Sequence, residues 1–415
     1  MRCFSYIGVA LICLGIHSCY KEELLPVHEE MVFELEVSPE MQEFIYTSRD
    51  SSYVIDEPGT KLTLNQETLD LDEIKTRGHN ALNYRRKSYT VHLNQSVTLS
   101  GINNGETRQL SRFKLLAMAM DYTYIEERIG FGLLEQHDLM PLFYRYVELR
   151  INGSSQGIYL LVEDPEEYYR KQGSEYILRR GYYNGIEDSR YKPSLYQIPR
   201  DSYESRFLSL YEALPTLHGE ELYEFLIQRV DLEQYFRKMG LDYLLKNGDY
   251  TDEVFFYALI DQDQIRFRII PWDYDDLFSS NPHEVGRTWG TGHLFGDRYY
   301  PTRQDILDEI GTRPIFSIED DLDYIIAMDP YLYHRYQECL AAMLQDLDAE
   351  DLDMLFELVR FELLPYYYRP EIISQSGFDQ QETSYKLWEQ NMEEKKNLLK
   401  NRLITMKEEL NDIQP

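Results

Sequence analysis

The sequence predicts an α+β fold that is divided into two lobes and ends in a helical C-terminal region. At 415 residues the chain exceeds one ordinary hydrophobic core, so more than one packed unit is expected. Alternating apolar and polar residues, typical of strands, dominate the first third, whereas apolar residues at helical spacing dominate the remainder. Such a separation of strands from helices favours two lobes of different composition.

The first lobe is expected over residues 31–164 and is predicted to be rich in strands. Its alternating segments are residues 31–37, 60–65, 87–93, 144–151 and 157–163. The last two are joined at Asn152-Gly153, which is a strong signal for a hairpin turn. Residues 109–137 show helical periodicity instead, and we expect two helices there, broken near Asp121-Tyr122.

The second lobe is expected over residues 165–415 and is predicted to be mostly helical from Pro165 onward. Helical spacing covers residues 202–213, 219–246, 315–363 and 381–410. The last of these segments has an apolar face made of Trp388, Met392, Leu399, Leu403, Met406 and Leu410. A hairpin of residues 254–259 and 265–270 interrupts the helices, and residues 279–303, rich in Gly, Pro, Ser and His, are expected to form a long loop.

The charge of the chain limits its partners. Lys and Arg total 42 and Asp and Glu total 73, which gives a formal net charge of −31. Such an anionic surface repels nucleic acid and anionic lipid headgroups, so neither is expected as a partner. Free nucleotide polyphosphate is also disfavoured unless a divalent cation or a local basic patch intervenes.

The N-terminal residues predict export and lipid anchoring. Residues 1–18 have a positive start and a short apolar stretch, as in a signal peptide. Cys19 follows Ile16-His17-Ser18, which resembles a bacterial lipobox, and Tyr20-Lys21-Glu22-Glu23 resembles the charged signal of surface lipoproteins in Bacteroidetes. Residues 19–30 are therefore expected to form a lipidated tether to the outer membrane or the cell surface. An ordinary secretory peptide that is cut nearby is the alternative.

Two acidic motifs near the middle of the chain point to chemistry. Asn247-Gly248-Asp249 follows a predicted helix, and Pro271-Trp272-Asp273-Tyr274-Asp275 follows the predicted hairpin. Acids two residues apart in an extended segment lie on one face, where like charges are costly without a cation. Protein kinases place a base and a metal ligand around a phosphate with a similar arrangement. The alternative for these acids is a polar loop with solvated carboxylates.

With three further motifs, the chain resembles the spore-coat protein H (CotH) kinase family, an atypical branch of the protein-kinase-like fold. The first motif runs from Arg77-Gly78-His79-Asn80 to Arg86-Lys87-Ser88-Tyr89. The second is Asp121-Tyr122-Thr123, and the third runs from Asn152-Gly153 through Gly157-Ile158-Tyr159 to Glu163. Together with the two acidic motifs they span roughly residues 60–280 in the family's order, which makes chance agreement improbable.

The resemblance implies ATP and Mg²⁺ or Mn²⁺ as cofactors, and it implies residues that hold the nucleotide. Lys87 would contact nucleotide phosphate from a strand of the first lobe, and Arg77 would support the same region. Glu163, with Asp164, would lie at the hinge beside the adenine and act through backbone groups. Trp272 would pack on the nucleotide or wedge the lobes apart.

The resemblance also implies catalytic and metal-binding roles. Asp249 would orient the hydroxyl of the acceptor and take its proton, and Asp273 and Asp275 would bind the metal. Together, these implied roles predict the transfer of a phosphoryl group from ATP to a Ser or Thr hydroxyl of an exported protein.

One departure from the kinase pattern keeps an alternative open. Kinase-like sites place an Asn five residues after the catalytic Asp, but this chain has Val254, which cannot bind a metal. The alternative is a catalytically weak surface protein that uses the fold as a binding scaffold. A metal-dependent hydrolase is less favoured, since none of the nine histidines forms a spaced metal motif.

Overall fold

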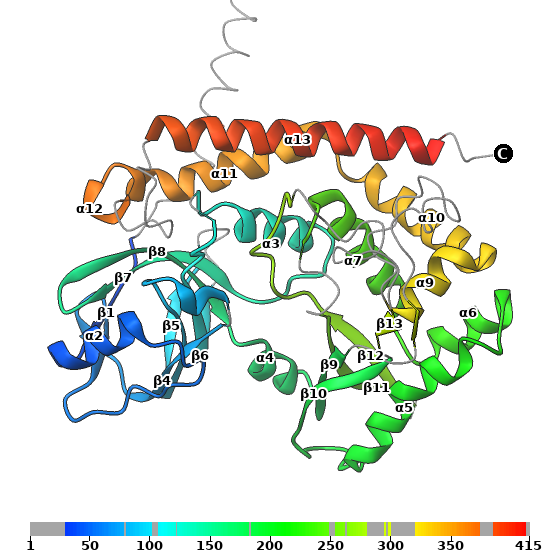
Figure 1. Cartoon of the computed structure of the whole chain (residues 1–415), viewed down its shortest axis with the longest axis horizontal. Coiled ribbons are helices and arrows are strands. Elements are labelled where there is room, and N and C mark those ends of the chain that lie inside the picture. Colours follow the sequence, from blue (N-terminus) through cyan, green and yellow to red (C-terminus); the bar gives the residue numbers. More distant parts are fainter. Residues whose placement is uncertain are drawn as a thin grey trace, which may run out of the picture.

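The structure is a computed structural model of the chain, and it shows two large β-sheets, of eight and four strands, with helices packed between and around them (Figure 1). It describes residues 30–78, 80–101, 107–121, 123–181, 184–248, 254–261, 264–279, 294–295, 298–299, 320–373 and 385–411. Helices and strands are both abundant and are largely segregated along the chain, so the predicted α+β class and the helical C-terminal region are confirmed.

The first sheet has eight strands and contains the first-lobe strands that the sequence predicts. In spatial order these are β3 (Glu67–Thr68), β2 (Lys61–Leu64), β1 (Val32–Glu36), β7 (Tyr144–Ile151), β8 (Ser154–Glu163), β6 (Thr107–Leu116), β5 (Ser88–Ser100) and β4 (Leu71–Arg77). Strands β1 and β7 pair in parallel, and the other neighbours are antiparallel. The β7–β8 hairpin turns at Asn152 and Gly153, both with positive φ, which confirms that prediction.

The predicted pair of helices over residues 109–137 is half wrong. Residues 107–116 form the strand β6, which lies between β5 and β8 in the sheet, and only α3 (Glu126–Gln136) is helical. Phe113 and Leu115 of β6 enter the core enclosed by the sheet, while Lys114 between them faces the other way. Pairing on both edges of this segment therefore overrides its helical spacing.

A second sheet of four strands interrupts the predicted helical lobe. Its order is β10 (Gly185–Tyr191), β9 (Tyr176–Gly181), β11 (Phe255–Asp261) and β12 (Gln264–Ile270). The predicted β11–β12 hairpin is confirmed. Strands β9 and β10 were not predicted, since the chain was expected to be helical from Pro165 onward. Only α4 (Pro165–Lys171) is helical directly after this proline. Strand β9 is stabilised by pairing with β11, which lies more than 70 residues further along the chain.

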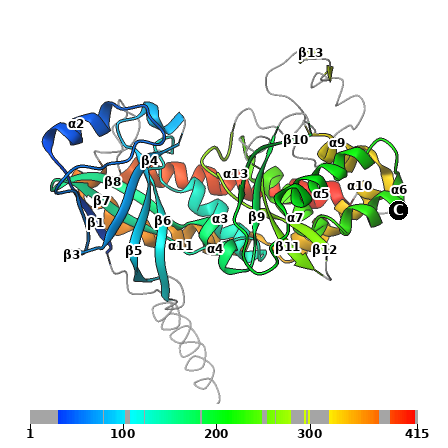
Figure 2. The ribbon, with the colours of Figure 1, turned by 90° about the horizontal axis from the view of Figure 1, so that it is seen from below.

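Most of the remaining helices lie in or close to the segments predicted to be helical, whereas those at residues 39–47, 80–83 and 370–373 were not predicted. In chain order, the remaining helices are α2 (Pro39–Thr47), η1 (Asn80–Asn83), α5 (Arg200–Ala213), α6 (Gly219–Ile227), α7 (Leu232–Leu245), α9 (Asp321–Met328), α10 (Pro330–Gln345), α11 (Ala349–Tyr367), α12 (Pro370–Ile373) and α13 (Tyr385–Asn411). All six residues of the apolar face predicted on the last helix are buried. The predicted loop at 279–303 falls almost entirely outside the described residues, apart from the short strands β13 (Leu294–Phe295) and β14 (Arg298–Tyr299) (Figure 2).

The eight-stranded sheet separates two hydrophobic cores. Leu161 of β8 faces the smaller core, which the curled sheet encloses with α2, and its neighbours Leu160 and Val162 face the larger one. Helix α3 belongs to the larger core, where Arg128 forms a buried double hydrogen bond with Glu362 of α11. Helix α3 thus packs in the larger core although it precedes residue 164, and the boundary between lobes at that residue stays a prediction.

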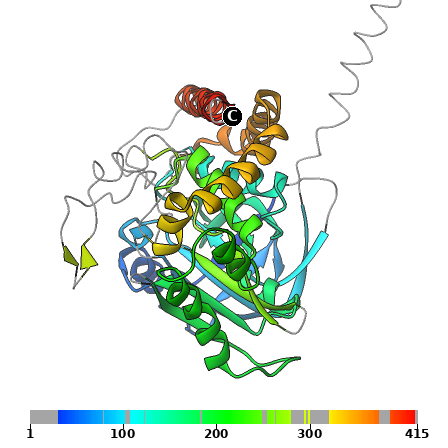
Figure 3. The same cartoon turned by 90° about the vertical axis from the view of Figure 1, so that its right-hand side faces the viewer.

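The helices of the C-terminal half cover the larger core, as an end-on view shows (Figure 3). Within the described part of the chain, no helix is both long enough and apolar enough to cross a membrane.

Candidate functional site

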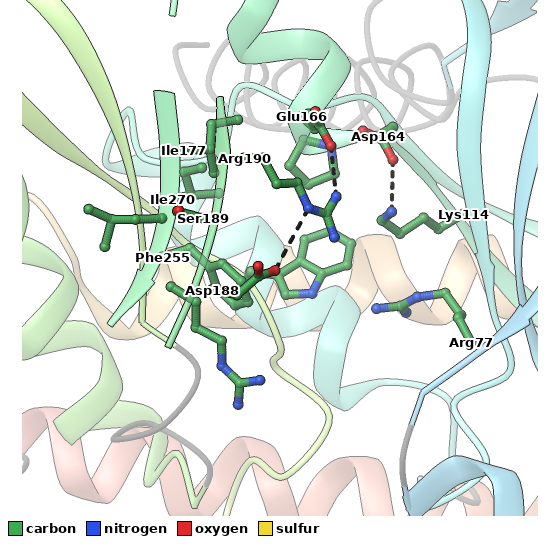
Figure 4. A pocket seen from close by; sticks show the side chains of 14 residues that line it. Arg77, Lys114, Asp164, Glu166, Ile177, Asp188, Ser189, Arg190, Phe255 and Ile270 are labelled. Carbon is green, nitrogen blue, oxygen red and sulfur yellow. Dashed lines mark hydrogen bonds and ion pairs between the residues drawn. The ribbon is translucent and has the colours of Figure 1, made fainter. Parts of the chain in front are cut away.

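A cleft lies between the two sheets and collects residues from both. Its narrow part has a volume of about 150 Å³ and its wide part about 750 Å³. The two parts share Arg77, Lys114, Arg179, Arg190, Phe255 and Trp272. The narrow part is closed by apolar side chains of the second sheet, among them Ile177, Phe255 and Ile270 (Figure 4).

The cleft brings cations of both sheets together although the chain is strongly acidic. Its lining includes the five cations Lys75, Arg77, Lys114, Arg179 and Arg190. They come from β4, β6, β9 and β10, so both sheets contribute. Acids are interspersed with them: the lining also contains Glu127, Asp164, Glu166, Glu187, Asp188, Asp273 and Asp275. The cleft therefore offers single cations to an anionic ligand rather than a surface of net positive charge.

The centre of the cleft is the ring of Trp272, with a cation from each of two first-sheet strands beside it. The guanidinium of Arg77, at the end of β4, lies 5.4 Å from the ring centroid, and the ammonium of Lys114 on β6 lies 5.8 Å from it. Trp272 itself is only 7% exposed. The contacts show Trp272 wedged between the sheets, and they hold two cations at one side of the cleft.

Lys114 is fixed by an ion pair at the junction of the lobes. Its ammonium lies 2.8 Å from a carboxylate oxygen of Asp164 (Figure 4). The other oxygen of Asp164 accepts the backbone N–H of Glu167 and so caps α4. Burial opposes ionisation of Asp164, but the charge of Lys114 and these hydrogen bonds prevail and lower its pKa to about 2. Burial also lowers the pKa of Lys114, which nevertheless has a carboxylate partner.

The acidic side of the cleft is formed by the segment after β12. Asp273 and Asp275 line the wide part, and Asp273 has a φ of +63°, a conformation that costs energy outside glycine. Within the described ranges, no three His, Cys, Asp or Glu side chains are grouped closely enough to hold a metal ion. Asp249, predicted as the catalytic base, lies outside the described residues, but Gly248 before it is described.

The two acidic motifs are packed directly against each other. The N–H of Gly248 donates to the carbonyl of Asp276 at 2.8 Å. A Cβ at position 248 would come within 2.1 Å of a carboxylate oxygen of Asp276, so any other residue would require the Asp276 side chain to move. The backbone that leads to Asp249 is therefore held beside the segment that carries Asp273 and Asp275.

A buried carboxylate on α7 links the same two motifs. One oxygen of Asp242 is 2.5 Å from the ammonium of Lys238, and the other accepts the hydroxyl of Tyr274 at 2.8 Å. Asn247 donates its side-chain N–H to that second oxygen at 3.4 Å and its backbone N–H to the carbonyl of Asp242 at 3.0 Å. All four residues are buried. Asp242 thus fixes Asn247 of the first motif relative to Tyr274 of the second.

Comparison with known proteins agrees with this geometry. The family model described as CotH kinase protein matches residues 74–351, about two thirds of the chain. The chain belongs to the CotH kinase protein family. A curated relative is the inner spore coat protein H of Bacillus subtilis (strain 168), which is 21% identical over 308 residues, covering 69% of this chain and 81% of that protein.

Two residues predicted to bind the nucleotide lie outside the cleft of this CotH domain. The ammonium of Lys87 donates to the carbonyls of Leu82 at 2.6 Å and Tyr84 at 2.7 Å, so it secures η1. Glu163 accepts the backbone N–H of Phe143 at 3.2 Å, and its neighbour Asp164 lines the cleft in its place. For both residues a contact with nucleotide stays a prediction.

Arg77, Trp272, Asp273 and Asp275 are the predicted site residues that the structure brings together in the cleft. Lys114, Arg179 and Arg190 were missed, because each lies on a strand that the sequence pattern did not reveal. A signal for Lys114 exists, since a lysine set between Phe113 and Leu115 is typical of a strand with two different faces.

Val254, which stands where kinases have a metal-binding Asn, is buried in the larger core. It is not among the residues that line the cleft. An Asn at position 254 would thus be surrounded by apolar side chains. Any metal bound in the cleft of this family member therefore has no ligand from position 254.

Glu127 of α3 is a further acid in the cleft that sequence reasoning missed. It lines the wide part, although the residue is only 3% exposed. Burial and, to a smaller extent, the nearby carboxylate of Asp273 raise its pKa to about 8, while Arg77 acts in the opposite direction. The metal-free cleft therefore contains a carboxyl group that is largely neutral at pH 7.

The Glu127→Gln variant is expected to lose part of the pH dependence of stability. In the unfolded chain Glu127 ionises near its ordinary pKa, so its contribution to stability is complete below that value and is lost as pH rises towards about 8. The free energy of unfolding of metal-free Glu127→Gln should therefore rise relative to that of the wild type as pH increases from about 5 to about 8, by up to about 1.4 kcal/mol per pH unit. Urea denaturation at both pH values measures this difference.

The matched control is Glu224→Gln, since Glu224 is an exposed glutamate on α6. It should change stability by less than about 0.5 kcal/mol at either pH. A difference between Glu127→Gln and the wild type that stays constant with pH would show that Glu127 ionises normally in the folded protein.

Proposed function

We propose that this CotH family member is a metal-dependent kinase, which transfers a phosphoryl group from ATP to a Ser or Thr hydroxyl of an exported protein. The observation that carries the proposal is the convergence of Arg77 and Lys114 on Trp272, in a cleft whose other side is formed by Asp273 and Asp275. Cations for the phosphates and carboxylates for a divalent metal are the two requirements of phosphoryl transfer.

The proposed donor lies along the cleft. Its base would occupy the narrow apolar part, against Ile177, Phe255 and Ile270. Its phosphates would extend into the wide part, where Arg77 and Lys114 offset their charge. Because Arg77 and Lys114 are already oriented by Trp272 and Asp164, little conformational freedom is lost on binding.

The proposed metal and acceptor lie on the acidic side. Carboxylates suit Mg²⁺ or Mn²⁺, which would neutralise phosphate charge, and Asp273 and Asp275 are the residues that would hold the ion. Asp249 would orient the acceptor hydroxyl and take its proton. The contacts of Asn247 and Gly248 support this role, since they hold the residues directly before Asp249 next to Tyr274 and Asp276.

A second candidate function is a nucleotide-binding scaffold with little catalytic activity. The burial of Val254 favours it, because the position that usually supplies a ligand for a second metal offers only an apolar side chain. Both candidates bind a metal–nucleotide complex, and they differ in whether the phosphoryl group is transferred.

Nucleotide binding and transfer test the proposal together. Calorimetry with ATP and Mn²⁺ should show binding that Lys114→Met weakens roughly 10- to 100-fold, as expected for the loss of a charged hydrogen bond to phosphate. Lys87→Met should bind ATP like the wild type, since Lys87 is engaged with η1. Asp249→Ala should keep ATP affinity but lose transfer of label from ATP to a generic acceptor, because it acts on the acceptor.

The outcomes separate the two functions. If the wild type binds ATP but transfers no phosphoryl group, the scaffold function is supported and the kinase proposal is wrong. Absence of ATP binding at about millimolar concentration with either metal would end both. Weaker ATP binding by Lys87→Met than by Lys114→Met would show that Lys87, rather than Lys114, contacts the phosphates.

We also propose that the protein is lipid-anchored at Cys19 to the outer membrane or the cell surface. The supporting pattern is the short apolar stretch that ends at this cysteine. Cys19→Ala should leave an unlipidated protein in the soluble fraction after cell lysis, because two or three acyl chains supply the membrane affinity. Recovery of Cys19→Ala with the membranes, as for the wild type, would contradict the anchor.

A further inference from the structure

The C-terminal helix α13 lies outside residues 74–351, which the family model matches, yet it touches the segments that carry the site motifs. With 27 residues it is about 40 Å long and extends across α11 above α3 and α7 (Figure 1). Its apolar face packs into the larger core. Two cations beside that face, Lys395 and Arg402, are seven residues apart and so lie on one side of the helix.

Lys395 binds the segment that begins α3. Its ammonium contacts the carboxylate of Glu126 and lies 3.3 Å from the hydroxyl of Thr123 and 3.7 Å from a carboxylate oxygen of Asp121. Asp121 in turn accepts the backbone N–H groups of Thr123 and Glu126, both at 2.8 Å. Lys395 thus stabilises a compact acidic turn, and the residue after Glu126 is Glu127, which lines the cleft.

The same ammonium also approaches Phe278, which lies three residues after the second acidic motif. It lies 5.6 Å from the ring centroid of Phe278, which has a φ of +56°. The backbone N–H of Phe278 donates to the carbonyl of Leu245 at 2.9 Å, at the end of α7. Lys395 is therefore positioned where α3, α7 and the segment from Pro271 to Phe278 meet.

Arg402 completes the C-terminus of α7. The last carbonyls of a helix lack partners within it and carry partial negative charge, and the last turn of α7 contains no basic residue. Arg402 of α13 supplies the missing positive charge. Its guanidinium donates to the carbonyl of Leu244 at 2.9 Å and to the carbonyl of Tyr243. Two residues after this turn the chain reaches Asn247 and then Asp249.

We infer that Lys395 and Arg402 are positioning residues, through which α13 holds the start of α3, the end of α7 and the segment 271–278 in one register. The inference rests on the proposed phosphoryl transfer, because that reaction requires Asp249 and Asp273 to keep fixed relative positions. Neither Lys395 nor Arg402 lines the cleft, so neither has to contact the nucleotide.

Lys400 provides a matched control on the same helix. Its ammonium pairs with Asp353 of α11 at 2.8 Å, so removing it costs an ion pair between helices without touching a motif-bearing segment. Lys395→Met and Arg402→Met should each lower kcat roughly 10- to 100-fold while the ATP KM and Kd change less than about threefold. Lys400→Met should match the wild type, and Lys395→Arg, which keeps the charge, should recover most of kcat.

Hydrogen exchange of the nucleotide-free full chain gives a readout that needs no catalysis. Lys395→Met should speed amide exchange in residues 123–130, and Arg402→Met in residues 241–248, roughly tenfold over Lys400→Met. If the wild type transfers no phosphoryl group, the proposed function fails, and exchange alone decides whether α13 sets the register. Exchange and kcat that match those of Lys400→Met in both variants would overturn the inference and leave α13 as a packing helix.

Discussion

The site depends on one buried carboxylate, that of Asp242. Through Lys238, Tyr274 and Asn247 it ties α7 to both acidic motifs, in surroundings from which water is excluded. A buried carboxylate is stable only while all its partners remain, and loss of one partner leaves an uncompensated charge or dipole. The network therefore favours a single arrangement of the motifs, and the geometry of the cleft follows from that arrangement.

The second constraint is electrostatic, since a chain with a net charge of −31 has to provide cations for an anionic ligand. It does so by bringing cations from four strands together and orienting some with carboxylates, as Asp164 orients Lys114. Because the lining of the cleft contains acids as well as cations, an anionic ligand needs a bound metal ion to offset part of its charge. A ligand that is both anionic and metal-bound fits this field, whereas a long polyanion such as nucleic acid meets the acidic surface.

The sequence could predict the features that depend on local pattern. The Asn152-Gly153 turn, the β11–β12 hairpin and the buried face of α13 are as expected, because each follows from residues close together in the chain. Strands β6 and β9 were not predicted, since they depend on pairing with distant strands, and for β6, which carries Lys114, the local alternation around this lysine was outweighed by helical spacing. The sequence also could not reveal the partners of a single side chain: the ammonium of Lys87 binds carbonyls of Leu82 and Tyr84, and its contact with nucleotide stays a prediction.

The central claim is that the cleft holds a metal–nucleotide complex between the Arg77–Trp272–Lys114 group and the acids of the 271–275 segment. Anomalous X-ray scattering from crystals of the full chain grown with ADP and Mn²⁺ tests it most directly. We predict an anomalous peak bound by Asp273 and Asp275, with the phosphates next to Arg77 and Lys114. Manganese bound elsewhere, or nucleotide absent from the cleft in crystals that contain both ligands, would contradict the account.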